Sequence, residues 1–576
     1  MIKVRYWSWI LLLSPLVAAA QGSSRGSIAQ PGRRPVTSSD SIAIQQLYFE
    51  AMRKKTIEDP RGATELFSRV LQMDATNDAA MYQLATLKKL QNNQPEVQQL
   101  LENAVALKPN NQWYWVALAD SYEKTNDIKK LEHVFDELLR INPDKPDFYF
   151  DKANALYIEK RYDEALAVYT KLEQITGLND ELAAGRQKIY LRQGKLDLAA
   201  AEIERLLANN PDQVRYYLML GEIYNTNNQT DKALKVLQRA ESISPENGML
   251  HLALADAYRG KKEYDTSFKQ LQLAFAAPNL DVEQKVRIVM GYIPKFPDAN
   301  AKASALALSR IAAEVHSNDA KAQAVYADML AQNNMFKEAK DVYKKSVKLN
   351  GDIYMVHEQL VRLELGESAW DEAIKDGENA LSLFPNQAWM NYLVAVAYLQ
   401  KKSAAKALSY LKNAVALQTD DKDLSAQSYA TLGDCYHELK DNSQSDAAYD
   451  KSLSFNPDNA YTLNNYAYYL SMRNEQLDKA AQMSKHTIDL QPNTASFEDT
   501  YAWILFKQKK YVDARQWIEK AMQHSKNNAT QTEHLGDILF YLGSTEAAVQ
   551  NWKKAKEYGS KSALLDRKIN EKKYIE

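Results

Sequence analysis

The side chains best suited to catalysis or metal binding are few and widely spaced in this chain. The sequence holds eight histidines and one cysteine, and no two histidines stand three or four residues apart, as ligands on one helix face would. Cys435 and His437 are two residues apart, which places them on different sides of a helix. We therefore expect Cys435 to be a small packed residue, and we predict neither a metal site nor a disulfide within the chain.

Signals for phosphate and nucleic-acid binding are absent as well. The 18 glycines form no Gly-x-Gly-x-x-Gly loop and no Walker loop, so we predict no cofactor. The chain has 72 basic and 74 acidic side chains, and its formal net charge is −2. Because nucleic-acid binders usually carry a clear basic excess, we predict no nucleic-acid partner.

The elements that must position the remaining side chains are helices that repeat along the chain. With 18 glycines and 16 prolines in 576 residues, the composition disfavours an all-β protein built on tight turns. The clearest repeating unit places, in order, Tyr217, Leu220, Gly221, Tyr224, Ala233, Leu237, Ala240 and Pro245. The pattern recurs at Trp115, Leu118, Ala119, Tyr122, Phe135 and Pro143, and at Tyr429, Leu432, Gly433, Tyr436, Tyr449 and Pro457. The first four positions share one face of a helix, and the proline ends a second helix.

The prolines set the period of the repeat independently. Pro109 and Pro143 are 34 residues apart, and Pro211 and Pro245 are also 34 residues apart. Extending this period along the chain predicts repeats that begin near residues 44, 78, 112, 146, 180, 214, 248, 282, 320, 354, 388, 426, 460, 495 and 529.

The pattern resembles the tetratricopeptide repeat, whose 34-residue unit reads W-x2-L-G-x2-Y, then A-x3-F, then P. The resemblance implies an all-α fold, a right-handed superhelix or α-solenoid of about 14–15 helix-turn-helix repeats with a C-terminal capping helix. A lone helix pair cannot bury its apolar face, so neighbouring pairs must stack.

Two breaks interrupt this register. The segment 278–300 contains Pro278 and Pro294, and the repeat spacing there is four residues too long. Either this segment is a hinge between two halves, or a longer helix absorbs the extra residues without a bend. Residues 419–425 hold a second insertion of four residues.

The first twenty residues have the layout of a secretory signal peptide. Lys3 and Arg5 precede an apolar run at 7–17, and small residues end at Ala20, where we predict cleavage. This predicts a periplasmic location; a secreted protein or one peripherally associated with the outer membrane is the alternative. No later apolar stretch approaches 18 residues, so we predict no transmembrane segment after cleavage. The predicted segments are a signal peptide at 1–20, a disordered linker at 21–43, an N-terminal array at 44–281, an irregular repeat or hinge at 282–319, a C-terminal array at 320–562 and a capping helix at 563–576.

In this family the second, fifth, ninth and twelfth residues of each first helix line a concave groove. In the present chain aromatic side chains are frequent at these places, which suits contact with a peptide or a sugar. Alternatively, a tight superhelix buries these rings against one another. The predicted partner-binding residues are Trp113, Phe150, Asn154, Tyr157, Trp389, Tyr392, Tyr461, Asn464, Tyr468, Trp503, Phe506 and Phe540.

The C-terminal third also resembles tetratricopeptide proteins that are exported to the cell envelope of Gram-negative bacteria. The resemblance rests on LNNYAYYLS at 463–471 and on the aromatic segments at 499–522 and 533–555. It implies a periplasmic scaffold that binds a peptide or partner protein of the cell envelope, in envelope assembly or export. A glycan-associated scaffold for polysaccharide export is the alternative. We expect no enzyme, because the repeats leave no segment to fold as a catalytic domain.

Overall fold

The computed structural model describes residues 37–91, 93–417 and 419–576, and every regular element within them is a helix. The predicted signal peptide at 1–20 and most of the predicted linker lie outside the described residues. None of the helices formed by the described residues combines the length and the hydropathy that a bilayer span requires. The chain divides into two units, residues up to 223 and residues from 224 onward, and the division falls within α11 (Val214–Thr226).

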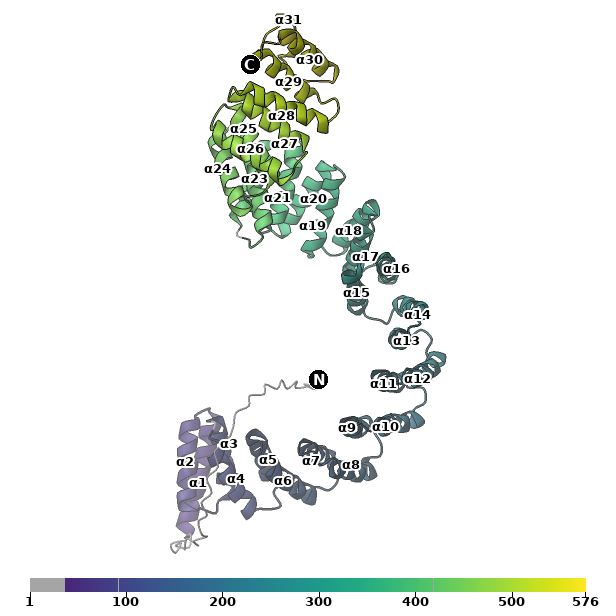
Figure 1. The fold of residues 1–576 in the computed structure, drawn as a ribbon. Coiled ribbons are helices and arrows are strands. Elements are labelled where there is room, and N and C mark those ends of the chain that lie inside the picture. Colours follow the sequence, from purple (N-terminus) through teal and green to yellow (C-terminus); the bar gives the residue numbers. More distant parts are fainter. Residues whose placement is uncertain (1–36, 92, 418) are drawn as a thin grey trace, which may run out of the picture. The chain divides into compact units, whose positions relative to one another are not determined.

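In the first unit, consecutive helices pair as hairpins and neighbouring hairpins stack (Figure 1). Its helices are α1 (Ser38–Thr56), α2 (Pro60–Met73), α3 (Asp78–Leu90), α4 (Gln94–Leu107), α5 (Gln112–Thr125), α6 (Ile128–Ile141), α7 (Pro146–Ile158), α8 (Tyr162–Thr176), α9 (Asp180–Arg192) and α10 (Leu196–Asn209).

The second unit continues the same arrangement. It begins with α12 (Thr230–Ile243), α13 (Gly248–Gly260), α14 (Tyr264–Ala276), α15 (Val282–Met290), the 3-10 turn η1 (Ile293–Lys295), α16 (Ala299–Val315), α17 (Ala320–Gln332), α18 (Phe336–Leu349), α19 (Tyr354–Gly366), α20 (Trp370–Leu383), α21 (Ala388–Gln400) and α22 (Ala404–Ala416). It ends with α23 (Lys422–Glu438), α24 (Asn442–Phe455), α25 (Ala460–Met472), α26 (Leu477–Leu490), α27 (Ala495–Lys507), α28 (Tyr511–His524), α29 (Ala529–Tyr541), α30 (Thr545–Glu557) and α31 (Leu565–Glu571).

The first helices begin at the predicted residues in all repeats except the first and the twelfth. The prediction of a disordered linker up to residue 43 is wrong for its last residues, because α1 begins at Ser38. Thr37 and Asp40 form a capping box: the Thr37 hydroxyl accepts from the Asp40 amide, and the Asp40 carboxylate accepts from the Thr37 amide. The twelfth first helix, α23, begins at Lys422 instead of 426, because the Asp421 side chain caps it at the Leu424 amide. The four inserted residues thus lengthen this helix.

Three repeats carry Trp or Tyr at the fourth place of the first helix and use it in the same way: Trp115, Tyr149 and Tyr217. The ring of each residue is buried, while its polar atom donates a hydrogen bond to the carbonyl six residues earlier, in the turn that precedes the helix. Trp115 Nε1 donates to the Pro109 carbonyl at 2.8 Å, and the Tyr149 hydroxyl donates to the Pro143 carbonyl at 2.8 Å. One side chain therefore fills the core and satisfies a turn carbonyl that the helix leaves unpaired.

The glycine at the eighth place allows the second helix to approach closely. A Cβ added at Gly433 would lie 2.9 Å from Tyr449, and one added at Gly536 would lie 2.5 Å from Trp552. Both distances are shorter than a carbon–carbon contact. The large ring of the second helix can therefore pack here only because the first helix carries no side chain at this place.

The irregular segment and the predicted cap are both helical. Within the predicted segment 282–319, α15, η1 and α16 replace the usual helix pair, and α15 and α16 still pack together. Whether this segment bends as a hinge stays a prediction. The capping helix is shorter than predicted: α31 covers Leu565–Glu571 and packs against α30.

Candidate functional site

The predicted groove residues differ widely in exposure. Trp113 and Tyr461 are 61 % and 66 % exposed. Asn154 is also exposed. The half-buried members are Phe150, Tyr157, Trp389, Tyr392, Asn464, Tyr468 and Phe540. Trp503 is only 7 % exposed and Phe506 is buried with it, so for these two the alternative of rings buried against one another holds.

Other rings cover Trp503 and Phe506. Trp503 stacks on Phe506 at 4.9 Å and on His534 of α29 at 4.1 Å between ring centres. Tyr574, beyond α31, packs edge-on against Phe506 at 5.6 Å. The segment after α31 and the neighbouring first helix thus bury rings that the repeat pattern alone would leave facing the groove.

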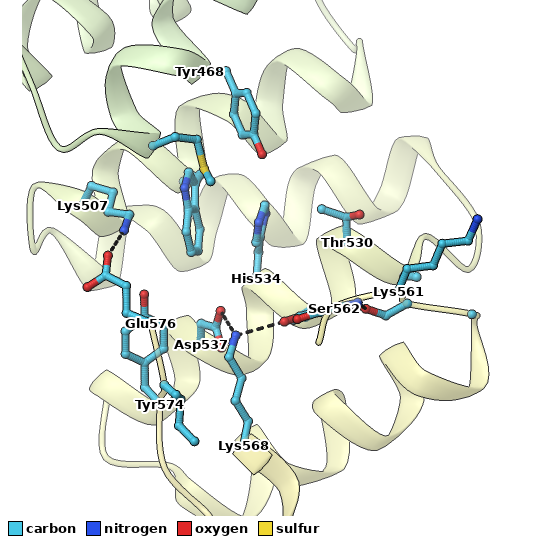
Figure 2. A pocket seen from close by; sticks show the side chains of 17 residues that line it. Tyr468, Lys507, Thr530, His534, Asp537, Lys561, Ser562, Lys568, Tyr574 and Glu576 are labelled. Atoms are coloured by element: carbon cyan, nitrogen blue, oxygen red, sulfur yellow. Dashed lines mark hydrogen bonds and ion pairs between the residues drawn. The ribbon is translucent and has the colours of Figure 1, made fainter. Parts of the chain in front are cut away.

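A pocket of about 600 Å³ lies in the last repeats of the second unit (Figure 2). Side chains of α25, α27 and α29 form one part of its lining, and residues 559–562, Lys568 and residues 574–576 form the other. Of the twelve predicted residues, Tyr468 and Trp503 line this pocket. Figure 2 shows Tyr468 and His534 pointing toward one another across it.

A buried cluster of charges forms the base of the pocket. Lys568 Nζ donates to the two Asp537 carboxylate oxygens at 2.9 and 2.8 Å and to Glu533 at 3.0 Å. Trp552 Nε1 donates to Asp537 at 2.9 Å, and the Ser560 hydroxyl donates to Glu533 at 2.8 Å. Burial raises the pKa of Asp537 in spite of this ammonium. Burial also opposes ionisation of Glu533. The charge of Lys568 and the hydrogen bonds that Glu533 accepts outweigh this effect, so the pKa of Glu533 is lowered.

His534 and Lys507 place two further basic groups at the pocket. His534 Nδ1 lies 2.8 Å from the Asp499 carboxylate. Burial alone would lower the pKa of His534, but Asp499 and nearby carboxylates outweigh it, so this pKa lies above its ordinary value. Lys507 forms an ion pair with Glu576 and lies 5.2 Å above the Trp503 ring.

The indole nitrogen of Trp503 is an unsatisfied polar group beside the pocket. Trp503 Nε1 is buried and has no hydrogen-bond partner among the described residues. Its residue lines a pocket that also carries ammonium, imidazole, carboxylate and hydroxyl groups. Such a mixture can orient a polar ligand through hydrogen bonds while the rings supply apolar contact.

Trp389 and Tyr392 belong to a second aromatic group, nearer the middle of the second unit. The Arg362 guanidinium lies 4.2 Å above the Trp389 ring, and Trp389 Nε1 donates to the Asp421 carboxylate at 3.1 Å. Tyr392 packs edge-on against Trp389 at 5.9 Å. Arg362 itself donates to Glu358 at 2.8 and 3.0 Å. These contacts explain why both rings are only half-exposed.

The predicted partner-binding residues include none of the charged residues of the pocket. The register of the first helices places Glu533 at the fifth and Asp537 at the ninth position, so the repeat pattern itself could have identified them. Lys568 and Glu576 lie after the last repeat, and no signal in the sequence connects them to α27 or α29. Cys435 is a buried residue, as predicted, and its thiol donates to the Ala404 carbonyl at 3.2 Å.

Comparison with known proteins finds the tetratricopeptide repeat several times along the chain. Three tetratricopeptide repeat family models match, one at residues 116–179 and 188–248, the second at 448–482 and the third at 426–459. No curated protein matches the chain.

The chain is also similar to solved structures, among them the following three. A tetratricopeptide repeat protein from Parabacteroides merdae has 17 % identity and a TM-score of 0.36, with 44 % of this chain and 98 % of that chain covered. The Cut9–Hcn1 hetero-tetramer of the APC/C has 12 % identity and a TM-score of 0.37, with coverages of 87 % and 97 %. YrrB, a tetratricopeptide protein with an unusual peptide-binding site, has 19 % identity and a TM-score of 0.29, with coverages of 35 % and 97 %.

The family models match both units of the chain, and the structure shows the physical reason for the pattern that they describe. The aromatic residue at the fourth place caps a turn, the glycine at the eighth place admits the second helix, and the helix pairs recur at the predicted residues. The chain is a tetratricopeptide repeat protein.

Proposed function

We propose that this chain is an exported, non-enzymatic scaffold that binds a peptide or partner protein of the cell envelope on the inner faces of its first helices. Its place would be the periplasm of a Gram-negative bacterium, in envelope assembly or export. The family supports the scaffold role, because stacked helix pairs present a pre-formed surface that loses little conformational entropy on binding.

One observation carries the proposal: large apolar side chains stand exposed at the second place of several first helices. Trp113 in the first unit and Tyr461 in the second are both more than half exposed, and Met249 and Met355 are exposed at the same place in their repeats. Aromatic residues with free surface dominate the binding energy of many protein interfaces. The core of the helix pairs does not need these side chains, so contact with a partner is their best explanation.

Alanine substitution at these positions tests the proposal. The double variant Trp113→Ala, Tyr461→Ala should lose a partner that is cross-linked to the tagged chain in cells, because the exposed rings are removed while the core is intact. The variant Tyr264→Ala is the matched control, since Tyr264 is 64 % exposed but opens a second helix. The circular dichroism of all three proteins should be unchanged.

Two results would count against a protein-binding scaffold. Partner recovery that is equal in the double variant and in the control would show that the first-helix rings are not the binding surface. Recovery of polysaccharide alone would favour a glycan-associated scaffold, because Trp113 and Tyr461 could also stack on sugar rings.

The proposed location has its own test. A protein exported by the signal at 1–20 and cleaved after Ala20 would begin at Gln21. Mass spectrometry of the protein from the periplasmic fraction should therefore find Gln21 as the first residue. A cytosolic protein that keeps residues 1–20 would contradict export.

A further inference from the structure

The segment after α31 lies along the pocket without regular secondary structure. Lys572 has a φ of 48°, in the left-handed region, and ends the helix. Tyr574, Ile575 and Glu576 then line the pocket (Figure 2). Among the described residues, no backbone–backbone hydrogen bond connects 573–576 to the repeats. Side-chain contacts alone therefore hold this segment, which makes it exchangeable in a way that a packed helix is not.

Lys507 provides the main polar contact. Its side chain is only 10 % exposed, and Glu576 is the one carboxylate that pairs with it within the part of the chain that the structure describes. Glu576 itself is largely exposed. Without Glu576, the pocket would hold a nearly buried ammonium that lacks a counter-charge, and such a group favours an anionic ligand.

Tyr574 provides the main apolar contact. Its ring packs against Phe506 at 5.6 Å and against Tyr541 at 5.3 Å. The Lys568 ammonium lies 5.3 Å above the same ring. Tyr574 and Ile575 are nevertheless only half-buried, as in a docked peptide rather than a core element.

We propose that residues 572–576 are an internal ligand of this pocket, and that a partner segment with the same chemistry displaces them. The inference rests on the proposed scaffold function and names its ligand: an acidic peptide segment with an aromatic residue two positions before the acidic one. Lys507 would bind the carboxylate, and Phe506 and Tyr541 would bind the aromatic ring. The attached segment competes at high effective concentration, so the pocket opens only to a partner that binds well.

The decisive experiment compares the full chain with a variant that ends at Glu571. The probe is a fluorescein-labelled peptide Lys-Lys-Tyr-Ile-Glu with an amidated end, so that the Glu side chain carries its only carboxylate. Fluorescence anisotropy should show that this peptide binds the truncated variant at least about tenfold more tightly than the full chain, because the internal competitor is gone. The control peptide Lys-Lys-Ala-Ile-Gln should bind neither protein measurably. No binding of the first peptide to a folded truncated variant would overturn the proposal.

Two single substitutions, one in the full chain and one in the truncated variant, sharpen the test. Glu576→Gln in the full chain should also tighten peptide binding, since it removes the internal carboxylate and leaves the segment in place. Lys507→Gln in the truncated variant should abolish the gain in peptide affinity that truncation produces. Lys573→Gln is the matched control, because Lys573 pairs with Glu571 at 2.8 Å and does not line the pocket. Equal effects of Glu576→Gln and Lys573→Gln would contradict a specific subsite.

The outcome separates this inference from the scaffold function. If the peptide fails to bind while Trp113→Ala, Tyr461→Ala still releases the cross-linked partner, only the internal-ligand inference fails. If the peptide binds but the double variant Trp113→Ala, Tyr461→Ala keeps its cross-linked partner, the partner surface lies at the pocket and not along the first helices. Association of full chains that disappears on truncation would show that the segment occupies the pocket of a second copy instead, and would overturn the internal arrangement.

Discussion

At the scale of single residues, one repeat places a buried cation where several others place an aromatic residue. Trp115 and Tyr149 occupy the fourth place of their helices and donate to turn carbonyls. Lys285 occupies the same place in α15, is fully buried, and donates to the Ala277 carbonyl at 2.9 Å. Its Nζ also lies 2.7 Å from His316 Nε2, and burial lowers the pKa of Lys285 to about 8. The irregular repeat therefore carries a buried charge that its neighbours lack.

Replacing Lys285 by methionine should stabilise the protein. Among the described residues no carboxylate pairs with Lys285, and an apolar side chain of similar length avoids the desolvation cost, so we expect a gain of roughly 1–2 kcal/mol in the free energy of unfolding. Chemical denaturation with urea at pH 7.5 measures it. Lys321→Met, at an exposed position, is the control.

The same substitution should change the pH dependence of stability. Because the pKa of Lys285 falls from 10.5 to about 8 on folding, the unfolded chain binds more protons between these two values. The unfolding free energy of the unmodified protein should therefore rise with pH across this window. Lys285→Met should lack this part of the rise, and an identical pH profile for both proteins would contradict the buried charge.

At the scale of helices, the hairpin depends on glycine where a large ring crosses. Trp552 of α30 would lie 2.5 Å from a Cβ at position 536, so Gly536→Ala should force the ring away and weaken its hydrogen bond to Asp537. We expect a loss of roughly 1–3 kcal/mol, measured as a lower thermal midpoint.

Gly366→Ala is the matched control for this substitution. Gly366 ends a first helix, and a Cβ there would meet nothing within 4 Å. Alanine also has the higher helix propensity, so this variant should be neutral or slightly stabilising. Equal losses of stability in Gly366→Ala and Gly536→Ala would show that backbone freedom, not ring packing, is the reason for glycine at position 536.

At the scale of the whole molecule, the main packing contacts are local. In both units, helices pack chiefly against helices one or two places along the chain. Stability should therefore approximate a sum over neighbouring repeats. The ion pair between Lys507 and Glu576 is an exception, since 69 residues separate its partners.

A fragment that ends at Asp281 should consequently fold without the remainder of the chain. The cut falls between α14 and α15 and leaves earlier helix pairs whole. It exposes Phe275, which is buried against α16 in the full chain, so the fragment should melt at a lower temperature than the intact protein. Circular dichroism should show an unchanged helical signal per residue. An aggregated or largely unfolded fragment would contradict near-independence of the repeats.

Local pattern was enough to predict the helices. The prolines set the 34-residue period, a small eighth place recurs in most repeats and an aromatic fourth place in several. These positions recur because each repeat packs its helix pair with residues close in sequence. The predicted starts were wrong only at Ser38 and Lys422, where a capping side chain extends the helix beyond the repeat pattern.

The site was only partly predictable. The register brought Tyr468 and Trp503 to the right helices, but it could not show that Trp503 is buried. Lys568 pairs with Asp537, which lies 31 residues earlier in the chain, and Glu576 pairs with Lys507, which lies 69 residues earlier. No repeat pattern encodes such contacts, because they form only when a segment outside the repeats folds back. Sequence alone determined the helical repeat and its phase, while tertiary packing decided which rings are covered and which charges share one pocket.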